Sequence, residues 1–311
     1  MIVAKLQGGL WNQMFQYAFA KSLSVKFSKA LKFETSFFNY FLGKESYLSK
    51  RKFELDIFTG SRDINSANYT NRYLYTYSNK YLDFIVLKCK NIFNNFFSWY
   101  FRELVRWYNT NFVKKIEKAL LKNSIILDGN WQSEKFFMWY EDKIRNDFQF
   151  DVVLSAYACE MKNLIQSKNS ISIHIRRGDY INSVNSSLFA QCNLNYYYNS
   201  IQYMQKNIDD PTFFIFCEDE EWAIKNFTLD CDVIIVTPNQ EYPYEDMYLM
   251  SRCNHNIIAN STFSWRGAWL NNNTNKIIIH PSLLFTAHSW VDDSNFYPPS
   301  WISLPINSDA K

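Results

Sequence analysis

One stretch of the sequence decides the fold prediction, Ile171-Ser172-Ile173-His174-Ile175-Arg176-Arg177-Gly178-Asp179-Tyr180. Apolar residues alternate over its first half, which predicts a β-strand, and two arginines, a glycine and an aspartate follow directly. In open α/β sheets, ligands bind in the crevice beyond the carboxyl ends of the strands. Paired guanidinium groups at that place suit a diphosphate, because their planar forks of donors match phosphate oxygens. From this stretch alone, a structural arginine–aspartate ion pair is an equally good interpretation.

Strands and helices alternate regularly after this stretch. We expect strands at residues 171–175, 213–217, 233–236, 257–259 and 277–280, and helices near 196–204, 220–227, 245–251 and 262–270. Such alternation through short connections predicts a parallel, doubly wound sheet.

The beginning of the chain repeats this pattern. A strand at 2–6 leads through a glycine loop into a helix that opens at Asn12, and further strands are expected at 30–33 and 125–127. The buried face of that helix is predicted to carry Phe15, Ala18, Phe19 and Leu23. The fold class predicted is therefore α/β, with two Rossmann-like domains, 1–165 and 166–311, that face a cleft. Residues 38–125 carry no chemical motif.

The amino-acid composition excludes some classes of protein. The 311 residues suit two domains, and 47% hydrophobic residues can form large cores. Lys+Arg 33 against Asp+Glu 30 gives a net charge of +3, which argues against a dedicated nucleic-acid binder. The six cysteines form no CxxC pair, so we expect neither disulfides nor a zinc cluster, and a reducing cytosol is the default location.

The N-terminus shows no signal peptide, and no run of about 18 uninterrupted apolar residues is present for a membrane-spanning helix. An aromatic stretch with lysines, 81–106, fits an interfacial membrane contact, although packing on its own domain is the better interpretation.

Polar residues gather after the expected strands. In the second half they are Arg176, Arg177 and Asp179, then Glu218 and Asp219, then Asn239, and finally Asn260, Ser261 and Thr262. Structural ion pairs have no reason to collect at one edge, so the pattern favours a binding site there. Each loop also has a plainer interpretation, because Asp219 and Ser261 are common types of helix N-cap.

The first loop holds Gly8-Gly9, two of only seven glycines. Paired glycines let the backbone approach a ligand closely, and the helix that follows would point unpaired N–H groups at an anion. A plain tight turn is the alternative.

Metal and other catalytic motifs fit poorly. Asp230-Cys231-Asp232 matches a DxD pattern, but it precedes a strand and therefore lies at the opposite sheet edge; Glu218 and Asp219 are the better metal candidates. We expect no metal or other cofactor, because the arginines make one less necessary. Neither GxSxG nor HExxH is present.

Five segments resemble the α-1,2-fucosyltransferases of glycosyltransferase family 11. They are GGLWNQMFQYAFA from Gly8, WQSEKFF from Trp131, HIRRGDY from His174, FCEDEEW from Phe216 and DMYLMSRCNHNIIANSTFSWRGAWL from Asp246. They follow the family's order along nearly the whole chain.

The resemblance implies a GT-B-type glycosyltransferase, with the acceptor on the first domain and the donor, GDP-β-L-fucose, on the second. It implies inverting, metal-independent transfer of L-fucose to the 2-hydroxyl of a terminal β-galactoside. Arg176 would be the principal ligand of the diphosphate, supported by His174 and Arg177. Asp219 would contact the guanosine, Ser261, Thr262 and Phe263 would hold base and phosphate, and Asn12 would lie beside the reacting sugar.

Four residues depart from the family pattern: Trp11 and Arg266 replace a glycine and a tryptophan, Glu218 an aspartate, and Asn130 an aromatic residue. Rival interpretations are a related fucosyltransferase with another acceptor and a catalytically silent nucleotide- or glycan-binding protein. The composition suggests an AT-rich bacterial genome, and hence surface-polysaccharide or O-antigen synthesis in the cytoplasm, with peripheral contact at the inner membrane as a further expectation.

Overall fold

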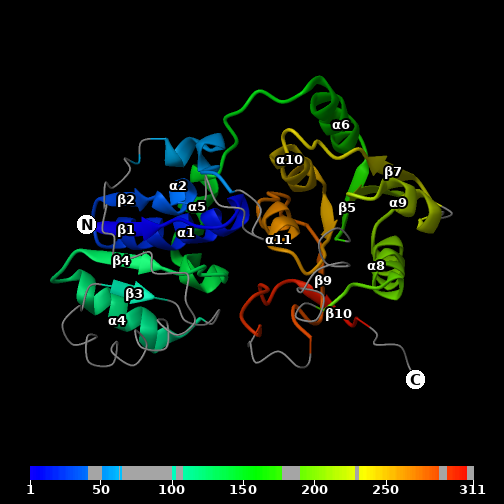
Figure 1. Ribbon diagram of the computed structural model, residues 1–311. Coiled ribbons are helices and arrows are strands. Elements are labelled where there is room, and N and C mark those ends of the chain that lie inside the picture. The colour runs from blue at the N-terminus through cyan, green and yellow to red at the C-terminus, as the bar shows by residue number, and fades with distance from the viewer. Residues whose placement is uncertain are drawn as a thin grey trace. The chain divides into compact units, whose positions relative to one another are not determined.

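The computed structural model describes residues 1–40, 51–62, 64, 100–102, 108–176, 190–227, 231–286 and 293–306 (Figure 1). The chain divides into two compact units, Met1–Gln149 and Phe150–Lys311, and each holds one sheet of parallel strands. The boundary expected from the sequence lies later, at 165/166. Helix α6 (Ala156–Gln166) belongs with the second unit because it packs on α10 (Tyr244–Arg252) and on β5 (Asn169–Ile175).

The sheet of the first unit has the order β2-β1-β4-β3. Its strands are β1 (Ile2–Lys5), β2 (Leu31–Glu34), β3 (Tyr100–Arg102) and β4 (Ile125–Asp128). The helices are α1 (Leu10–Lys26), α2 (Ser36–Tyr40), α4 (Thr110–Leu120) and α5 (Glu141–Asp147), with 3-10 turns at Leu55–Ile57, Thr59–Ser61, Glu134–Phe136 and Met138–Tyr140.

Helix α1 forms the centre of this unit's core. Its predicted apolar face is buried, and the ring of Phe19 lies 4.8 Å, centroid to centroid, from the rings of both Trp131 and Phe136. The helix begins at Leu10 and not at Asn12, because Gly9 is already its extended N-cap residue. Gly8 before it has φ +76, a conformation that favours glycine.

The sheet of the second unit has the order β10-β9-β8-β5-β6-β7. Its remaining strands are β6 (Pro211–Cys217), β7 (Val233–Val236), β8 (His255–Ile257), β9 (Ile278–Pro281) and β10 (Ile302–Leu304). Helices α8 (Leu194–Asn207) and α9 (Glu220–Asn226) lie on one side of it, and α10 and α11 (Thr262–Trp269) lie on the other (Figure 1). This is the Rossmann order, and the predicted doubly wound α/β fold is confirmed.

Two differences from the expected strands have physical causes. Strand β8 begins at His255, earlier than predicted, because buried hydrogen bonds satisfy its polar residues: Ile277 N donates to His255 Nδ1 at 2.9 Å, and Asn256 Nδ2 donates to Ser172 Oγ at 2.7 Å. Strands β3 and β10 were missed; each has only three residues.

The described cysteines, at 159, 192, 217, 231 and 253, are free thiols. Within the described ranges, no helix combines the length and apolarity needed to cross a membrane.

Candidate functional site

The loops after β5, β6 and β8 meet at one edge of the second unit's sheet. Strand β5 is the middle strand of the three, since it pairs with β6 on one side and with β8 on the other. The chain changes direction between β5 and β8, and ligands of doubly wound sheets bind at such a switch point. The sequence predicted Arg176, Glu218–Asp219 and Asn260–Thr262 at this edge, and the structure places them there.

Arg176 follows β5 directly and pairs with a neighbour from β6. Its Nη1 lies 3.0 Å from Glu218 Oε1, with the two side chains 24% and 57% exposed. The arginine therefore has a carboxylate partner at the end of the next strand. Arg177 and Asp179 lie outside the described residues.

His174 is a buried neighbour of Arg176 near the end of β5. Its ring lies 5.0 Å from the ring of Phe263 in α11, and its backbone carbonyl accepts from Tyr197 Oη at 3.3 Å. Within the described part of the chain, His174 Nδ1 is buried without a hydrogen-bond partner. Burial, with a smaller contribution from the charge of Arg176, lowers the pKa of His174 to about 3. The imidazole is therefore neutral at physiological pH.

The polar residues after β6 and β8 also hold the fold together. Asp219 Oδ1 caps α9 by accepting from Trp222 N at 3.0 Å, and Ser261 Oγ caps α11 by accepting from Phe263 N at 3.3 Å. Asn260 donates to the backbone carbonyls of Ala190 and Leu284. The capping interpretation thus holds for Asp219 and Ser261, and Asp219 also stays exposed to solvent at this edge.

Asp246, in the first turn of α10, was missed as a candidate. Its carboxyl has a pKa raised to about 7, chiefly by burial; the backbone N–H of Asn239 opposes the rise, and the charges of Glu245 and Glu218 add smaller contributions to it. Because it interacts with Glu218, this carboxyl belongs to the same sheet edge as Arg176. The signal that could have found it is the motif DMYLMSRCNHNIIANSTFSWRGAWL, which begins with this aspartate.

The DxD candidate lies away from this edge. Asp232 Oδ2 is 3.3 Å from Lys168 Nζ, and it precedes β7, as predicted; Asp230 lies outside the described residues. Among the residues described, no group of three or more His, Cys, Asp or Glu side chains is placed to hold a metal ion.

The first unit has its own switch point, between β1 and β4, where the Gly8-Gly9 loop lies. A Cβ at Gly8 would lie 2.6 Å from Asn12 Nδ2, and one at Gly9 would lie 3.3 Å from Arg51 Nη1. Asn12 Oδ1 accepts from Gln132 Nε2, which follows β4, at 2.8 Å. The glycines therefore make room for two polar side chains of the protein.

The start of α1 is not open to an anion in the way the sequence suggested. Leu10 N donates to Glu54 Oε2 at 2.9 Å, so a carboxylate of the protein already occupies that end. Gln13 fixes the segment of Glu54 by donating to the carbonyls of Gly8 at 3.0 Å and Lys52 at 2.8 Å.

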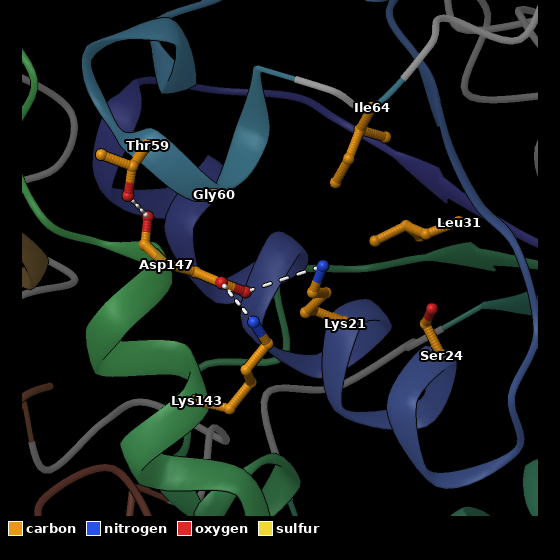
Figure 2. Close-up of a pocket in the computed structure, with 8 residues that line it drawn as sticks. All are labelled: Lys21, Ser24, Leu31, Thr59, Gly60, Ile64, Lys143 and Asp147. Carbon is orange, nitrogen blue, oxygen red and sulfur yellow. Dashed lines mark hydrogen bonds and ion pairs between the residues drawn. The ribbon is translucent and has the colours of Figure 1, made fainter.

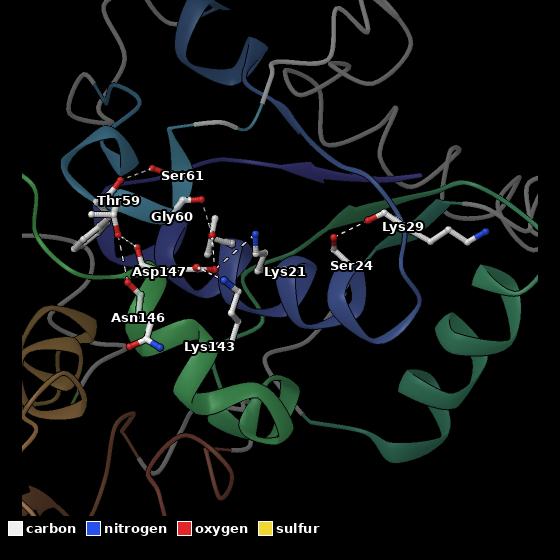
Figure 3. A network of polar contacts seen from close by, with 11 residues as sticks. Lys21, Ser24, Lys29, Thr59, Gly60, Ser61, Lys143, Asn146 and Asp147 are labelled. Carbon is white, nitrogen blue, oxygen red and sulfur yellow. Dashed lines mark hydrogen bonds and ion pairs between the residues drawn. The ribbon is translucent and has the colours of Figure 1, made fainter.

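A cavity of about 440 Å³ lies elsewhere in the first unit, beside the start of β2 (Figure 2). At its wall, Asp147 accepts from Tyr17 Oη at 2.8 Å and lies 3.3 Å from Lys143 Nζ and 3.8 Å from Lys21 Nζ (Figure 3). The carboxylate thus pairs with both lysines that line the cavity and offsets one of their two positive charges. None of the predicted site residues lines it.

The family model for glycosyl transferase family 11 matches residues 1–305. The chain belongs to this family. An alpha-1,2-colitosyltransferase of Escherichia coli is 32% identical over 98% of this chain and 99% of its own length. The O-antigen biosynthesis glycosyltransferase WbnK of Escherichia coli is 32% identical over 96% of this chain and 99% of its own.

A solved structure with the same fold supports the architecture. A mutant form of Arabidopsis thaliana FUT1, in complex with GDP, gives a TM-score of 0.53 at 11% identity, covering 89% of this chain and 69% of that one. Family 11 membership makes this protein a glycosyltransferase.

Proposed function

We propose that this family 11 enzyme transfers L-fucose, with inversion, from GDP-β-L-fucose to the 2-hydroxyl of a terminal β-galactoside. The observation that carries the proposal is Arg176 at the carboxyl end of β5, at the switch point of a Rossmann sheet. A guanidinium at this place is suited to a nucleoside diphosphate. The motifs that resemble those of α-1,2-fucosyltransferases support this choice of sugar and linkage.

The chemistry of glycosyl transfer suits these residues. The transition state resembles an oxocarbenium ion, while negative charge grows on the departing GDP. Donors that are already oriented toward that charge stabilise it most as the bond breaks. In the proposal, Arg176 supplies this stabilisation, Asp219 and Ser261–Phe263 hold the nucleotide, and neither a metal nor another cofactor is required.

At this sheet edge Arg176 is paired with the carboxylate of Glu218. Its ion pair with Glu218 joins two partly exposed side chains, and exposed pairs contribute only about 0–1 kcal/mol. Leaving Glu218 for a diphosphate therefore costs the guanidinium little.

We also propose a biological setting of O-antigen or surface-polysaccharide synthesis in a bacterial cytoplasm. The name of WbnK supports it. Contact with the inner membrane fits an acceptor assembled there, although the aromatic stretch that suggested it, 81–106, lies outside the described residues except for 100–102.

A second candidate donor is GDP-colitose, because a relative that matches nearly the whole chain is a colitosyltransferase. Colitose is L-fucose without its 3-hydroxyl, so the two donors differ by one hydrogen-bonding group. A site that binds that hydroxyl with buried polar groups rejects a donor lacking it by about 10⁴–10⁵, whereas a site without such groups does not.

The test is GDP release in EDTA from each donor, with and without a terminal β-galactoside. Release that depends on the acceptor and is faster from GDP-fucose establishes the proposal, and faster release from GDP-colitose identifies a colitosyltransferase. Tight GDP binding without release from either donor points to the silent binding protein or to a different acceptor. Failure to bind GDP refutes the assignment of Arg176.

A further inference from the structure

The loop after β1 in the first unit carries polar groups that the proposed donor chemistry does not use. They lie at the switch point between β1 and β4, the first unit's counterpart of the place where the second unit holds Arg176. Two observations there are independent of each other.

The first observation is the position of the exposed Arg51 side chain against Gly9. The position of a Cβ at Gly9 is 3.3 Å from Arg51 Nη1, 3.6 Å from Cζ and 3.8 Å from Nε, so the guanidinium group packs over this glycine. Within the described ranges, Arg51 makes no hydrogen bond or ion pair, although its charge opposes the burial that raises the pKa of Glu54. Its donors are therefore available to an external anion.

The second observation is a buried acceptor without a hydrogen-bond partner, beside the same loop. Gln132 is only 4% exposed, and its Nε2 is used in donating to Asn12 Oδ1. Its Oε1 is buried and has no hydrogen-bond partner among the described residues. A buried amide oxygen without a donor costs free energy, which a hydroxyl group of a ligand would recover.

Glu54 limits what the ligand can be. Its carboxylate already accepts the N–H of Leu10, so the helix end does not add to the attraction for an anion. A diphosphate at this loop would be repelled by the Glu54 carboxylate, whereas a single anionic group can bind to Arg51 alone.

We propose that Arg51, Asn12 and Gln132 form a subsite for an acceptor sugar that carries an anionic group. Gln132 Oε1 accepts from a hydroxyl of the sugar, and the Arg51 guanidinium donates to a carboxylate or a phosphate on it. This inference rests on the proposed function, because it requires that the ligand of the first unit is the acceptor glycan.

The experiment compares three acceptors in the GDP-release assay with GDP-fucose: methyl β-galactoside, methyl β-galacturonide and methyl β-galactoside 6-phosphate. We expect one of the two anionic acceptors to exceed the neutral one about tenfold in kcat/KM, as a charge-assisted hydrogen bond would give. Which of them does so distinguishes the carboxylate from the phosphate.

Arg51→Gln should remove that preference while leaving the Kd of GDP, measured by calorimetry, within about twofold of the wild type. Lys52→Gln is the matched control, since it removes an adjacent exposed positive charge and should keep the preference. Gln132→Met should raise KM for all three acceptors. Thermal unfolding of each variant shows that it is folded.

The proposal is overturned if the wild type treats the three acceptors alike, or if Arg51→Gln and Lys52→Gln change the preference equally. It is also overturned if Arg51→Gln weakens GDP itself, because the anion is then the donor's. Should the enzyme show no transfer at all, saturation-transfer NMR of methyl β-galacturonide and methyl β-galactoside 6-phosphate on wild type and Arg51→Gln tests the subsite separately from the proposed function. Equal signals from wild type and variant for both probes overturn it.

Discussion

Replacing Arg176 is the sharpest test of the second unit's site. The side chain is 24% exposed, and its carboxylate partner is itself 57% exposed. Because exposed ion pairs contribute about 0–1 kcal/mol, the loss of the pair with Glu218 should change the free energy of unfolding by about 1 kcal/mol or less. Thermal unfolding of Arg176→Ala, measured beside its activity, separates a loss of chemistry from misfolding.

The expected loss of activity follows from the several N–H donors of the Arg176 guanidinium group. Removing one preorganised donor to a developing negative charge typically costs ~10²–10³ in rate, and Arg176 offers two or more such donors. Arg176→Ala should abolish measurable transfer. Arg176→Lys should not restore it, because an ammonium group keeps the charge but not the planar fork.

The assay is acceptor-dependent GDP release, with GDP affinity measured by calorimetry on the same preparations. Glu218→Gln is the control that separates the two partners: if Glu218 only holds Arg176 at rest, its removal should tighten GDP by less than about fivefold. Weaker GDP binding in this variant would instead make Glu218 a ligand of the nucleotide. Near-normal turnover in Arg176→Ala or Arg176→Lys would refute the role given to Arg176.

Three further predictions concern stability. The pKa of Asp246 is raised to about 7, so the free energy of unfolding of the wild type should fall as pH rises from about 4 to 7, because the carboxyl ionises first in the unfolded chain. Over that window Asp246→Asn should become more stable relative to the wild type, by up to about 4 kcal/mol in urea titrations. Parallel pH curves for the two proteins would contradict this. Gly60→Ala should lower the free energy of unfolding by about 1–3 kcal/mol in the same titrations, because its Cβ would lie 2.3 Å from Asp147 Cβ and 2.6 Å from Asp147 Cα. An unchanged urea midpoint would show that the turn at Gly60 can move. Lys5→Met should lower the free energy of unfolding by about 3–5 kcal/mol, because it removes the cation that pairs with the buried Asp128 carboxylate. Adding Asp128→Leu should restore most of that loss. If the effects of the two substitutions on the free energy of unfolding simply add, the coupling is ruled out.

The sequence predicted those parts of the fold that depend on local pattern. Strands β5, β6 and β7 and helices α8 to α11 follow apolar periodicity and turn residues, and their order placed Arg176, Glu218 and Ser261 at one edge. Lys5 is a charged residue in the otherwise apolar first strand. The structure buries it, 3.1 Å from Asp128 on the neighbouring strand, a pairing over 123 residues that no local pattern indicates.

The first unit's loop shows what sequence patterns cannot provide. Paired glycines indicated a close approach, and a ligand was the expected partner. The protein itself fills the space, with Arg51 over Gly9 and the Glu54 carboxylate on the N–H of Leu10. Both residues come from a segment without periodicity, so only the tertiary fold reveals that they meet the loop.

His174 bears on where the acceptor's proton goes. A general base works best with a pKa near the operating pH, and burial holds the pKa of this imidazole at about 3. A ring so reluctant to take a proton is a weak base, and it adds no positive charge to a diphosphate. It remains a neutral hydrogen-bonding group, fixed by Phe263 and by the strand. Under the proposed function, we therefore expect Arg176 to stabilise the leaving group and a group other than His174 to take the proton of the acceptor.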